Sequence, residues 1–254
     1  MTNDLISLRA LVVSRDAELR DLFRQAAAFS PVPVEVVEAA DGAAACEQLA
    51  AKPGNAAVDL AYLDGALPRE EVTRIVTAPA AEAKPFSILM VTGHAGVAFA
   101  TDAVAGKPTR LEESQWLLDR SMRVRLPTRV LVVDDSPTMR TIMRKTLAAT
   151  RFPFAVTEAA EGLTALELVR EGGFDLVFLD YNMPNFSGLE TLTEFKRERR
   201  RVSVVMITST ASEALAKRVR DLGAAFLKKP FYPNDIEKVL CGYYGLRALY
   251  PKES

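Results

Sequence analysis

Polar residues stand at the ends of apolar runs in the second half of this 254-residue chain, at Asp134, Asp135, Asp180, Thr208 and Lys229. In alternating β/α units, parallel strands bring their carboxyl ends to one edge of the sheet, where ligands bind. We therefore expect these side chains to converge. Clustered carboxylates repel one another and raise each other's pKa unless cations offset them. Mg²⁺, which prefers oxygen ligands, and the Lys229 ammonium would supply that offset.

The chemistry that such a cluster favours is phosphoryl transfer. The Asp180 carboxylate would attack phosphorus while Mg²⁺ and Lys229 neutralise the developing charge. Each residue also has a structural explanation, because Asp134 and Asp135 would favour the dipole of a following helix and a lysine before proline is an ordinary loop charge. Since all these coincidences would have to fall at one sheet edge, the pattern favours a reactive site.

The elements that must position these residues alternate between short apolar runs, typical of buried strands, and amphipathic helical patterns. The strands expected in the second half are 129–133, 154–158, 176–179, 202–207 and 224–227. The helices expected after them are 136–147, 162–171, 189–199, 213–222 and 233–242. The first half predicts the same alternation from 8–13 onwards, and its third strand, 58–63, ends at Asp64.

The two halves of the chain repeat one another. Three segments match in order: Asp59-Leu-Ala-Tyr-Leu-Asp64 with Asp175-Leu-Val-Phe-Leu-Asp180, Met90-Val-Thr92 with Met206-Ile-Thr208, and Gly106-Lys107-Pro108 with Lys228-Lys229-Pro230. Two copies of one β/α unit explain this pattern better than a single large domain. We assign residues 1–125 to the first domain and residues 126–254 to the second.

Four motifs of the second copy resemble those of the receiver domain of two-component response regulators. They are Val132-Val133-Asp134-Asp135-Ser136, Leu179-Asp180-Tyr181-Asn182-Met183-Pro184, Ile207-Thr208-Ser209 and Lys228-Lys229-Pro230. The resemblance covers nearly all of residues 129–245. It implies an α/β fold of two tandem flavodoxin-like (CheY-like) domains, each a doubly wound five-stranded parallel sheet. The first is expected to have a shortened fourth helix and fifth strand.

The resemblance implies that Asp180 accepts a phosphoryl group from a histidine kinase or a histidine phosphotransfer protein. The Mg²⁺ ligands would be Asp134, Asp135, Asp180 and the backbone carbonyl of Asn182. The protein would then be a phosphoprotein that carries an aspartyl phosphate within a phosphorelay.

Three further residues receive roles from the same resemblance. Thr208 would bind a phosphoryl oxygen, and Lys229 would pair with the phosphoryl group. Phe226 stands where the family carries its switch aromatic. Phosphorylation would pull Thr208 inward, let Phe226 change rotamer and reshape the face made by the fourth helix, fifth strand and last helix.

The first copy resembles a receiver more weakly, over residues 8–123, and is expected to be a degenerate receiver. Asp64, Thr92 and Lys107 remain in register with the phosphorylation site. Ser14 and Arg15, however, stand where the acidic pair should be, so the Mg²⁺ site is weakened. The interval from Thr92 to Lys107 is also shorter than that from Thr208 to Lys229, and Val104 replaces the switch aromatic.

Two interpretations of the first copy stay open. In the favoured one, it is a docking or dimerisation module that does not accept phosphate. In the other, Arg15 stands in for the metal and Asp64 is still phosphorylated weakly. His94, the only histidine in the chain, is expected to be a loop residue and not a phosphoryl carrier.

Composition excludes several other classes of protein. The net charge of -1 argues against a dominant attraction to nucleic acid. No apolar run approaches the roughly 18 residues that span a bilayer, and the N-terminus lacks a signal-peptide pattern, so we expect a cytoplasmic protein without membrane insertion. Cys46 and Cys241 match no metal or redox spacing.

The function expected is therefore that of a response regulator that signals through protein contacts and is not an enzyme. The face made by the fourth helix, fifth strand and last helix of the second copy would bind a downstream protein or a second copy of the chain, since no separate output domain is expected. A phosphorylation-independent structural adaptor is the first alternative. The second is an aspartyl-phosphate phosphatase of the haloacid-dehalogenase type, which requires an acid two residues after Asp134, where Ser136 stands instead.

Overall fold

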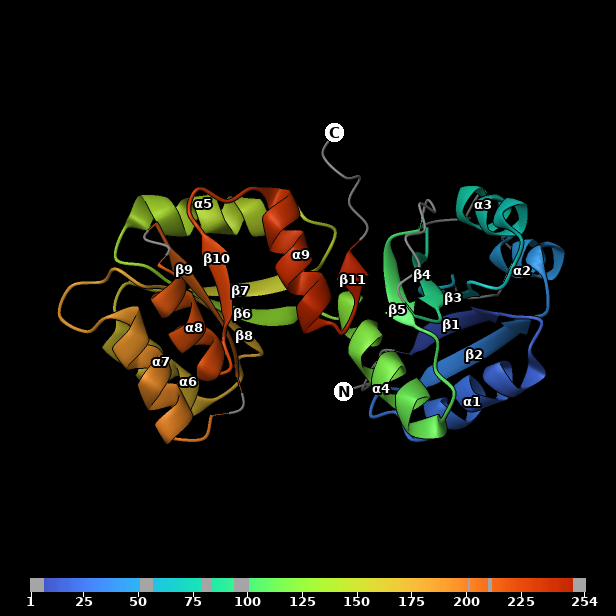
Figure 1. Cartoon of the computed structure of the whole chain (residues 1–254), viewed down its shortest axis with the longest axis horizontal. Coiled ribbons are helices and arrows are strands. Elements are labelled where there is room, and N and C mark those ends of the chain that lie inside the picture. The colour runs from blue at the N-terminus through green and yellow to red at the C-terminus, as the bar shows by residue number, and fades with distance from the viewer. Residues whose placement is uncertain are drawn as a thin grey trace, which may run out of the picture. The chain divides into compact units, whose positions relative to one another are not determined.

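The protein, described here from a computed structural model, divides into two compact units (Figure 1). Residues 7–50, 57–78, 84–93, 101–200, 202–209 and 212–248 are described. Unit 1 comprises Met1–Val124 together with Tyr244–Ser254, and unit 2 comprises Arg125–Tyr243. His94 lies outside the described residues. No helix in the described ranges is long and apolar enough to cross a membrane.

Unit 2 is a five-stranded parallel sheet with helices on both faces. Its strands are β6 (Thr128–Val133), β7 (Phe154–Ala159), β8 (Leu176–Asp180), β9 (Ser203–Thr208) and β10 (Ala225–Lys228), in the order β10-β9-β8-β6-β7. Its helices are α5 (Pro137–Ala148), α6 (Gly162–Glu171), α7 (Gly188–Arg197), α8 (Glu213–Asp221) and α9 (Pro233–Tyr243). This is the CheY-like, flavodoxin-like order expected from the sequence.

Unit 1 repeats this order. Its parallel strands are β1 (Leu8–Val13), β2 (Val34–Ala39), β3 (Leu60–Asp64), β4 (Phe86–Val91) and β5 (Ala103–Gly106). Its helices are α1 (Ala17–Ala27), α2 (Gly42–Leu49), α3 (Arg69–Thr77) and α4 (Leu111–Ser121), followed by the short 3₁₀ helix η1 (Met122–Val124). The expected shortened fourth helix falls between β4 and β5, where residues 94–100 lie outside the described part of the chain. The strands β5 and β10 are each four residues long.

The first sheet carries a sixth strand that the sequence did not predict. β11 (Arg247–Ala248) pairs antiparallel with the outer edge of β5, so the order is β11-β5-β4-β3-β1-β2. The chain after Tyr243 therefore groups with unit 1, whereas the second domain expected from the sequence was 126–254. The cause is main-chain pairing at a sheet edge, which requires no side-chain pattern.

The central strands are buried on both faces, which is why they appear in the sequence as continuous apolar runs. All residues of β8 are buried, and Val177, Phe178 and Leu179 are fully shielded from solvent. Asp180, the last residue of β8, is only 3% exposed. A carboxylate at this point is held at the sheet edge by a rigid apolar strand.

Helix starts follow ordinary capping chemistry. Ser136 caps α5 through its hydroxyl, with Pro137 at the first helical position. Ser187 and Glu190 form a capping box at the start of α7.

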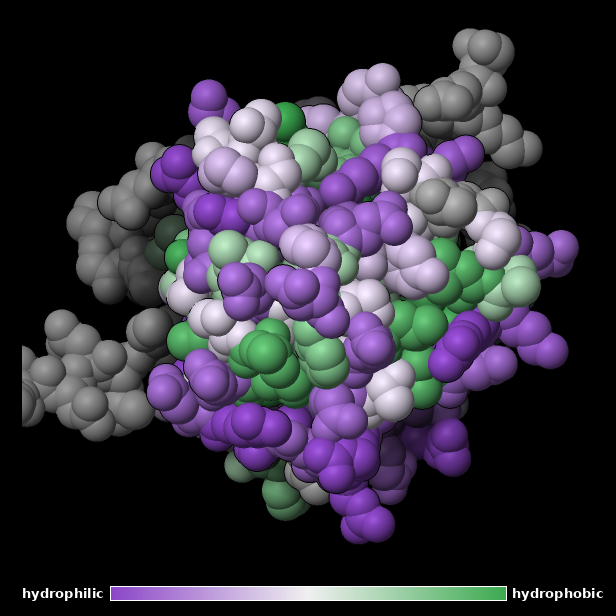
Figure 2. Space-filling view, turned by 90° about the vertical axis from the view of Figure 1, so that its left-hand side faces the viewer, coloured by the Kyte–Doolittle hydropathy of each residue, from purple (hydrophilic) through white to green (hydrophobic). Residues whose placement is uncertain are grey.

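On the face drawn in Figure 2, hydrophilic side chains surround smaller groups of hydrophobic ones. The described helices of unit 2 carry exposed ion pairs such as Arg197 with Glu194.

The same side-chain contact occurs inside each unit, in addition to the same topology. Asp59 accepts a hydrogen bond from the backbone N–H of Arg9 at 2.8 Å, and Asp175 accepts one from Arg129 at 2.9 Å. These aspartates precede equivalent strands, β3 and β8, and fasten them to β1 and β6. The contacts support the internal duplication inferred from the sequence.

Candidate functional site

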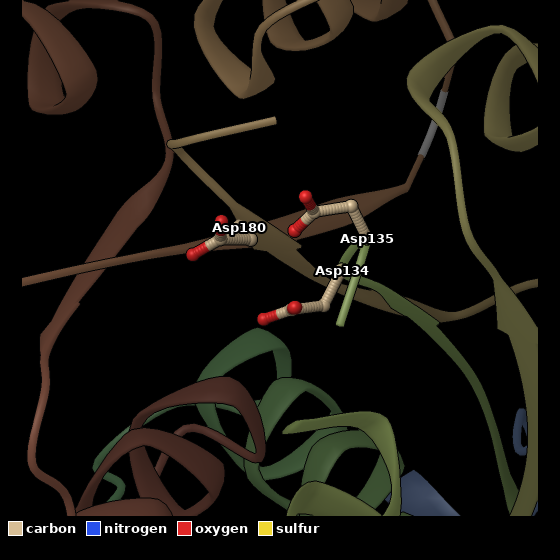
Figure 3. A group of neighbouring side chains, drawn as sticks. All are labelled: Asp134, Asp135 and Asp180. Carbon is tan, nitrogen blue, oxygen red and sulfur yellow. The ribbon is translucent and has the colours of Figure 1, made fainter. Parts of the chain in front are cut away.

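Three carboxylates meet at the carboxyl end of the second sheet. Asp134 and Asp135 follow β6, and Asp180 ends β8. One carboxylate oxygen from each lies within 4.8 Å of the others. Figure 3 shows the three side chains pointing to the same side of the strand ends. Asp134 and Asp180 are buried while Asp135 is exposed, so the cluster opens to solvent on one side.

Lys229 joins two of these carboxylates. Its ammonium donates to Asp180 Oδ1 at 2.7 Å and to Asp134 Oδ2 at 3.0 Å. The backbone N–H of Lys229 donates to the carbonyl of Thr208 at 2.8 Å, which extends the β9–β10 pairing by one residue. The lysine is therefore positioned by its main chain as well as by its charge.

The electrostatics of the site favour binding of a cation. Burial raises the pKa of Asp180, and the neighbouring Asp134 adds to this, although Lys229 and the amide of Asn182 oppose it. Burial would lower the pKa of Lys229, but the hydrogen bonds to Asp180 and Asp134 outweigh it and raise that pKa. Three carboxylates against one ammonium leave two uncompensated negative charges. A divalent cation with oxygen ligands would neutralise them.

Arg140 hydrogen-bonds to the backbone of the turn that carries Asp134 and Asp135. Its guanidinium donates to the backbone carbonyl of Asp134 at 2.7 Å and forms an ion pair with Glu158 at 3.0 Å. The Asp134 side chain in turn accepts from the backbone N–H of Ser136 at 2.9 Å. Sequence reasoning missed Arg140. The sequence feature that could have identified it is a long cationic residue in the first turns of the helix that follows the acidic pair.

Gly188 allows the start of α7 to approach the end of β8. A Cβ at this position would lie 2.1 Å from the carbonyl oxygen of Asp180, closer than any real contact. The backbone N–H of Gly188 donates to the carbonyl of Tyr181 at 3.2 Å. Sequence reasoning missed this residue too, although the Ser187 capping box beside it marks the helix start.

The other expected residues of the second site lie near this cluster or behind it. Thr208 ends β9 and is fully buried. The backbone N–H of Asn182 donates to Asp180 Oδ2 at 3.1 Å. Phe226 is partly buried on β10, opposite Met206, and packs against the core. Thr208 thus ends β9, and Lys229 directly follows the adjacent strand β10.

The first unit builds a different arrangement around Asp64. Ser14, fully buried, donates its hydroxyl to Asp64 Oδ2 at 2.5 Å, and Lys107 donates to the same oxygen at 2.9 Å. The backbone N–H of Ala66 donates to Asp64 Oδ1 at 3.0 Å. Ser14 therefore supplies a hydrogen bond at the place where Asp134 supplies a second negative charge in unit 2.

With Ser14 in the place of a second carboxylate, the pKa of Asp64 shifts in the opposite direction from the pKa of Asp180. Burial would raise the pKa of Asp64, but the hydrogen bonds from Ser14, Ala66 and Lys107 outweigh it and lower that pKa. In unit 2, burial and the charge of Asp134 outweigh the contacts with Lys229 and Asn182, so the pKa of Asp180 is raised. Asp64 is thus already compensated by neighbours of its own unit.

Two residues of the first copy lie elsewhere than their alignment implies. Arg15 is exposed and forms an ion pair with Glu71 at 2.7 Å. Thr92 follows the end of β4 and is exposed, whereas Thr208 is the buried last residue of β9. The structure therefore brings Asp64 and Lys107 together but places Thr92 differently from Thr208.

The scaffold under the two sites is nevertheless the same. Arg20 donates to the carbonyl of Ser14 at 2.6 Å and pairs with Glu38 at 3.2 Å, as Arg140 does with Asp134 and Glu158. The two units differ most in the residues that would bind a cation. The first unit is a receiver fold that has lost its acidic pair.

The fold and the acidic site together define a CheY-like receiver, and comparison with known proteins agrees. Residues 130–240 match the response regulator receiver domain. The chain is 35% identical over 115 residues to chemotaxis protein CheY-3 of Vibrio cholerae serotype O1, covering 44% of this chain and 88% of CheY-3. The protein belongs to the response regulator receiver family, with a tandem receiver-like architecture.

Two further similarities extend this result. Over 112 residues the chain is 33% identical to the transcriptional regulatory protein ResD of Bacillus subtilis (strain 168), covering 43% of this chain and 45% of ResD. A solved structure of a putative two-component system response regulator/GGDEF domain protein matches 93% of this chain and 97% of its own, with a TM-score of 0.51 and 20% identity. That likeness concerns the fold alone.

Proposed function

We propose that the protein is a response regulator in which Asp180 accepts a phosphoryl group from a histidine kinase or a histidine phosphotransfer protein. The observation that carries the proposal is the convergence of three carboxylates and one lysine at the sheet edge. The donor set fits Mg²⁺, because the carboxylate oxygens lie close enough to share one ion and leave negative charge uncompensated. Asp134, Asp135, Asp180 and the backbone carbonyl of Asn182 would hold it.

The reaction is an in-line displacement at phosphorus. An oxygen of Asp180 forms a bond to phosphorus while the bond from phosphorus to the donor imidazole nitrogen breaks, and the electron pair leaves with that nitrogen. Bound Mg²⁺ supplies charge neutralisation for the phosphoryl oxygens. Lys229, whose ammonium lies 2.7 Å from Asp180, would pair with the phosphoryl group.

The response to phosphorylation would begin at Thr208 and Phe226. Thr208 is buried at the end of β9 and can donate its hydroxyl to a phosphoryl oxygen. Phe226 is only partly buried on the adjacent strand, and its ring would change rotamer in response. The face formed by α8, β10 and α9 would then present a different surface to a downstream protein or a second copy.

Unit 1 would serve docking or dimerisation and would not accept phosphate. The contacts of Ser14 and Lys107 with Asp64 support this proposal, since they satisfy the carboxylate without a metal. The lowered pKa of Asp64 has the same cause. Arg15, paired with Glu71, is poorly placed to stand in for Mg²⁺.

Intact mass after incubation with acetyl phosphate and Mg²⁺ tests this function. The variants are wild type, Asp180→Asn and Asp64→Asn, the latter being the matched control in the homologous position. We expect one added phosphoryl group on wild type and Asp64→Asn and none on Asp180→Asn. Uptake that persists in Asp180→Asn would contradict the proposed acceptor. No uptake on any form, including with a histidine phosphotransfer protein as donor, would favour the adaptor.

A further inference from the structure

Unit 1 contains a cavity of about 430 Å³ beside the connection from β5 to α4. It is lined by residues 106–108 of that connection and by Glu112, Glu113, Trp116 and Leu117 of α4. All of these residues belong to unit 1. The volume falls within the range of roughly 300 to 1,000 Å³ that is usual for sites of small molecules.

The apolar part of the lining offers a flat aromatic surface. Leu117 is only 2% exposed and Pro108 is also buried, whereas Trp116, the only tryptophan in the chain, is 52% exposed. An indole stacks on planar ligands and, of the aromatic side chains, attracts a cation most strongly to its face. The half-exposed ring therefore favours a flat ligand with positive charge.

The Trp116 ring is held in place by two neighbours. The Arg120 guanidinium lies 5.8 Å from the ring centroid. Gly245 has a φ of +72°, and a Cβ at this position would lie 2.5 Å from the ring. Neither residue lines the cavity. The ring is thus fixed before any ligand enters, which reduces the entropy that binding would cost.

The charges around the cavity leave one carboxylate in excess. Lys107 pairs with Asp64 at 2.9 Å, and Arg110 pairs with Glu113 at 2.6 Å. Glu112 is exposed and forms no ion pair within the described ranges. It precedes Trp116 by four residues on α4, so the carboxylate and the indole lie on the same face of the helix. A cation bound there would contact both groups.

The corresponding stretch of unit 2 lacks this combination. Counted from the lysine and proline that both copies share, Glu112 and Trp116 correspond to Asn234 and Lys238. Lys238 is exposed and pairs with Asp235 at 3.8 Å. The receiver fold as such therefore requires neither the acid nor the indole at these positions.

We propose that this cavity binds a small planar organic cation, such as an aromatic amidine or amine. Trp116 would stack on the flat face of the ligand, and Glu112 would pair with its charge. Lys107 then belongs to two sites, because its side chain lines the cavity and its ammonium holds Asp64. Unit 1, which has lost the acidic pair for Mg²⁺, would thus bind a different kind of ligand beside the same sheet edge.

Fluorescence of Trp116 in the full chain tests the proposal, with benzamidine as the planar cation. Benzamide is neutral and benzoate is an anion, and both have nearly the same size and shape as benzamidine. We expect saturable quenching by benzamidine with a Kd of about 1 mM, as for a small fragment. Benzamide should bind about threefold to fivefold more weakly, and benzoate more weakly still.

These probes decide the ligand class. Equal affinity for the three compounds, or a preference for benzoate, would contradict a cation site. Benzoate would be preferred if the positive end of the α4 dipole outweighed the carboxylates of its first turn. Absence of saturable quenching by benzamidine would overturn the proposal itself.

Three variants locate the site. Glu112→Gln should weaken benzamidine about threefold to fivefold and leave benzamide unchanged. Glu70→Gln is the matched control, because Glu70 is the exposed second residue of α3 as Glu112 is of α4. Trp116→Leu should abolish the broadening of benzamidine signals in NMR spectra. Equal effects of the two glutamine variants, or binding that persists in Trp116→Leu, would place the ligand elsewhere and contradict the proposal.

The site goes beyond phosphate acceptance by Asp180 and is tested separately from it. Asp180→Asn should bind benzamidine as tightly as wild type does. Intact mass after incubation with acetyl phosphate and Mg²⁺ is recorded on the same samples. Benzamidine binding without phosphate uptake would uphold this inference and overturn the acceptor function, and phosphate uptake without benzamidine binding would do the reverse.

Discussion

The Lys229 ammonium lies 2.7 Å from Asp180 and 3.0 Å from Asp134, while Lys107 lies 2.9 Å from Asp64 beside the hydroxyl of Ser14. The two lysines occupy equivalent places in two copies of one fold. Lys229 faces two buried carboxylates, whereas Lys107 faces one buried carboxylate, Asp64, and lies 3.9 Å from the more exposed carboxylate of Asp16. This difference leads to the predictions below.

Removal of the Lys229 charge should destabilise unit 2 in the absence of Mg²⁺. In Lys229→Met, Asp134 and Asp180 keep their buried charges without a counterion, and we expect a loss of about 1 to 3 kcal/mol in the free energy of unfolding. Mg²⁺ should restore most of it by binding the folded state. Urea unfolding with and without Mg²⁺ measures this. Lys228→Met, an exposed neighbour, is the control. An equal loss of unfolding free energy in both variants would contradict a specific role of Lys229 as the counterion of Asp134 and Asp180.

Asp64 should stabilise unit 1 in a pH-dependent manner. Its pKa in the folded state is lowered from the ordinary value of 3.8. A lowered pKa means that the stabilisation is fully present above the unfolded-state value and is lost as pH falls through the folded-state pKa. Asp64→Asn should therefore lower the thermal midpoint at pH 7, with a cost of about 2 kcal/mol, and this cost should vanish in strong acid.

The emission of Trp116 follows the unfolding of unit 1 in that experiment. Glu112→Gln, an exposed change on α4, is the control and should leave the midpoint nearly unchanged at all pH values. A difference between Asp64→Asn and wild type that stays constant down to strong acid would show that the loss is not electrostatic.

The acidic pair should be sufficient to create a cation site in unit 1. The double variant Ser14→Asp with Arg15→Asp places two carboxylates beside Asp64 on the same scaffold that Arg20 provides. We expect Mg²⁺ titration by calorimetry to change from one binding event to two. In the triple variant with Asp64→Asn the second event should be absent. A double variant that still binds a single ion would mean that Lys107 or the backbone at β5 blocks the site.

Arg140 should act as a positioning residue for the Mg²⁺ ligands. Arg140→Ala frees the carbonyl of Asp134 from its 2.7 Å hydrogen bond, so the acidic turn loses its fixed geometry. We expect Mg²⁺ affinity to fall by about 10-fold or more, as for other residues that orient metal ligands. Arg144→Ala is the matched control, since Arg144 also pairs with Glu158, at 3.5 Å, and is largely exposed. Equal effects of the two variants on affinity would contradict the positioning role.

Several elements of the second site could be predicted from residue types and order alone. Asp180 follows a strand that is buried on both faces, and such a strand appears in sequence as an uninterrupted apolar run. Because the carboxyl ends of parallel strands lie at one edge of the sheet, the sequence alone predicts that Asp134, Asp180 and Lys229 meet. The loss of the acidic pair in unit 1 was equally plain from Ser14 and Arg15.

Only the tertiary structure decided what those substitutions do. Ser14 proved to be a buried donor to Asp64, and Arg15 turned outward to Glu71. Thr92 is exposed because β4 ends one residue before it. Side-chain direction and strand ends of this kind depend on packing between elements far apart in the chain, which a local pattern does not contain.

The same reason applies to Gly188, Arg140 and β11. Each makes a close contact with main-chain atoms, and main-chain atoms are identical in every residue. The pairing of Arg247 with Val104 joins distant parts of the chain through a strand of two residues, too short for any periodicity. The sequence by itself determined which residues carry the chemistry and that the fold occurs twice. The tertiary structure decided that Arg247 and Ala248 pair with β5 and which contacts hold each site in place.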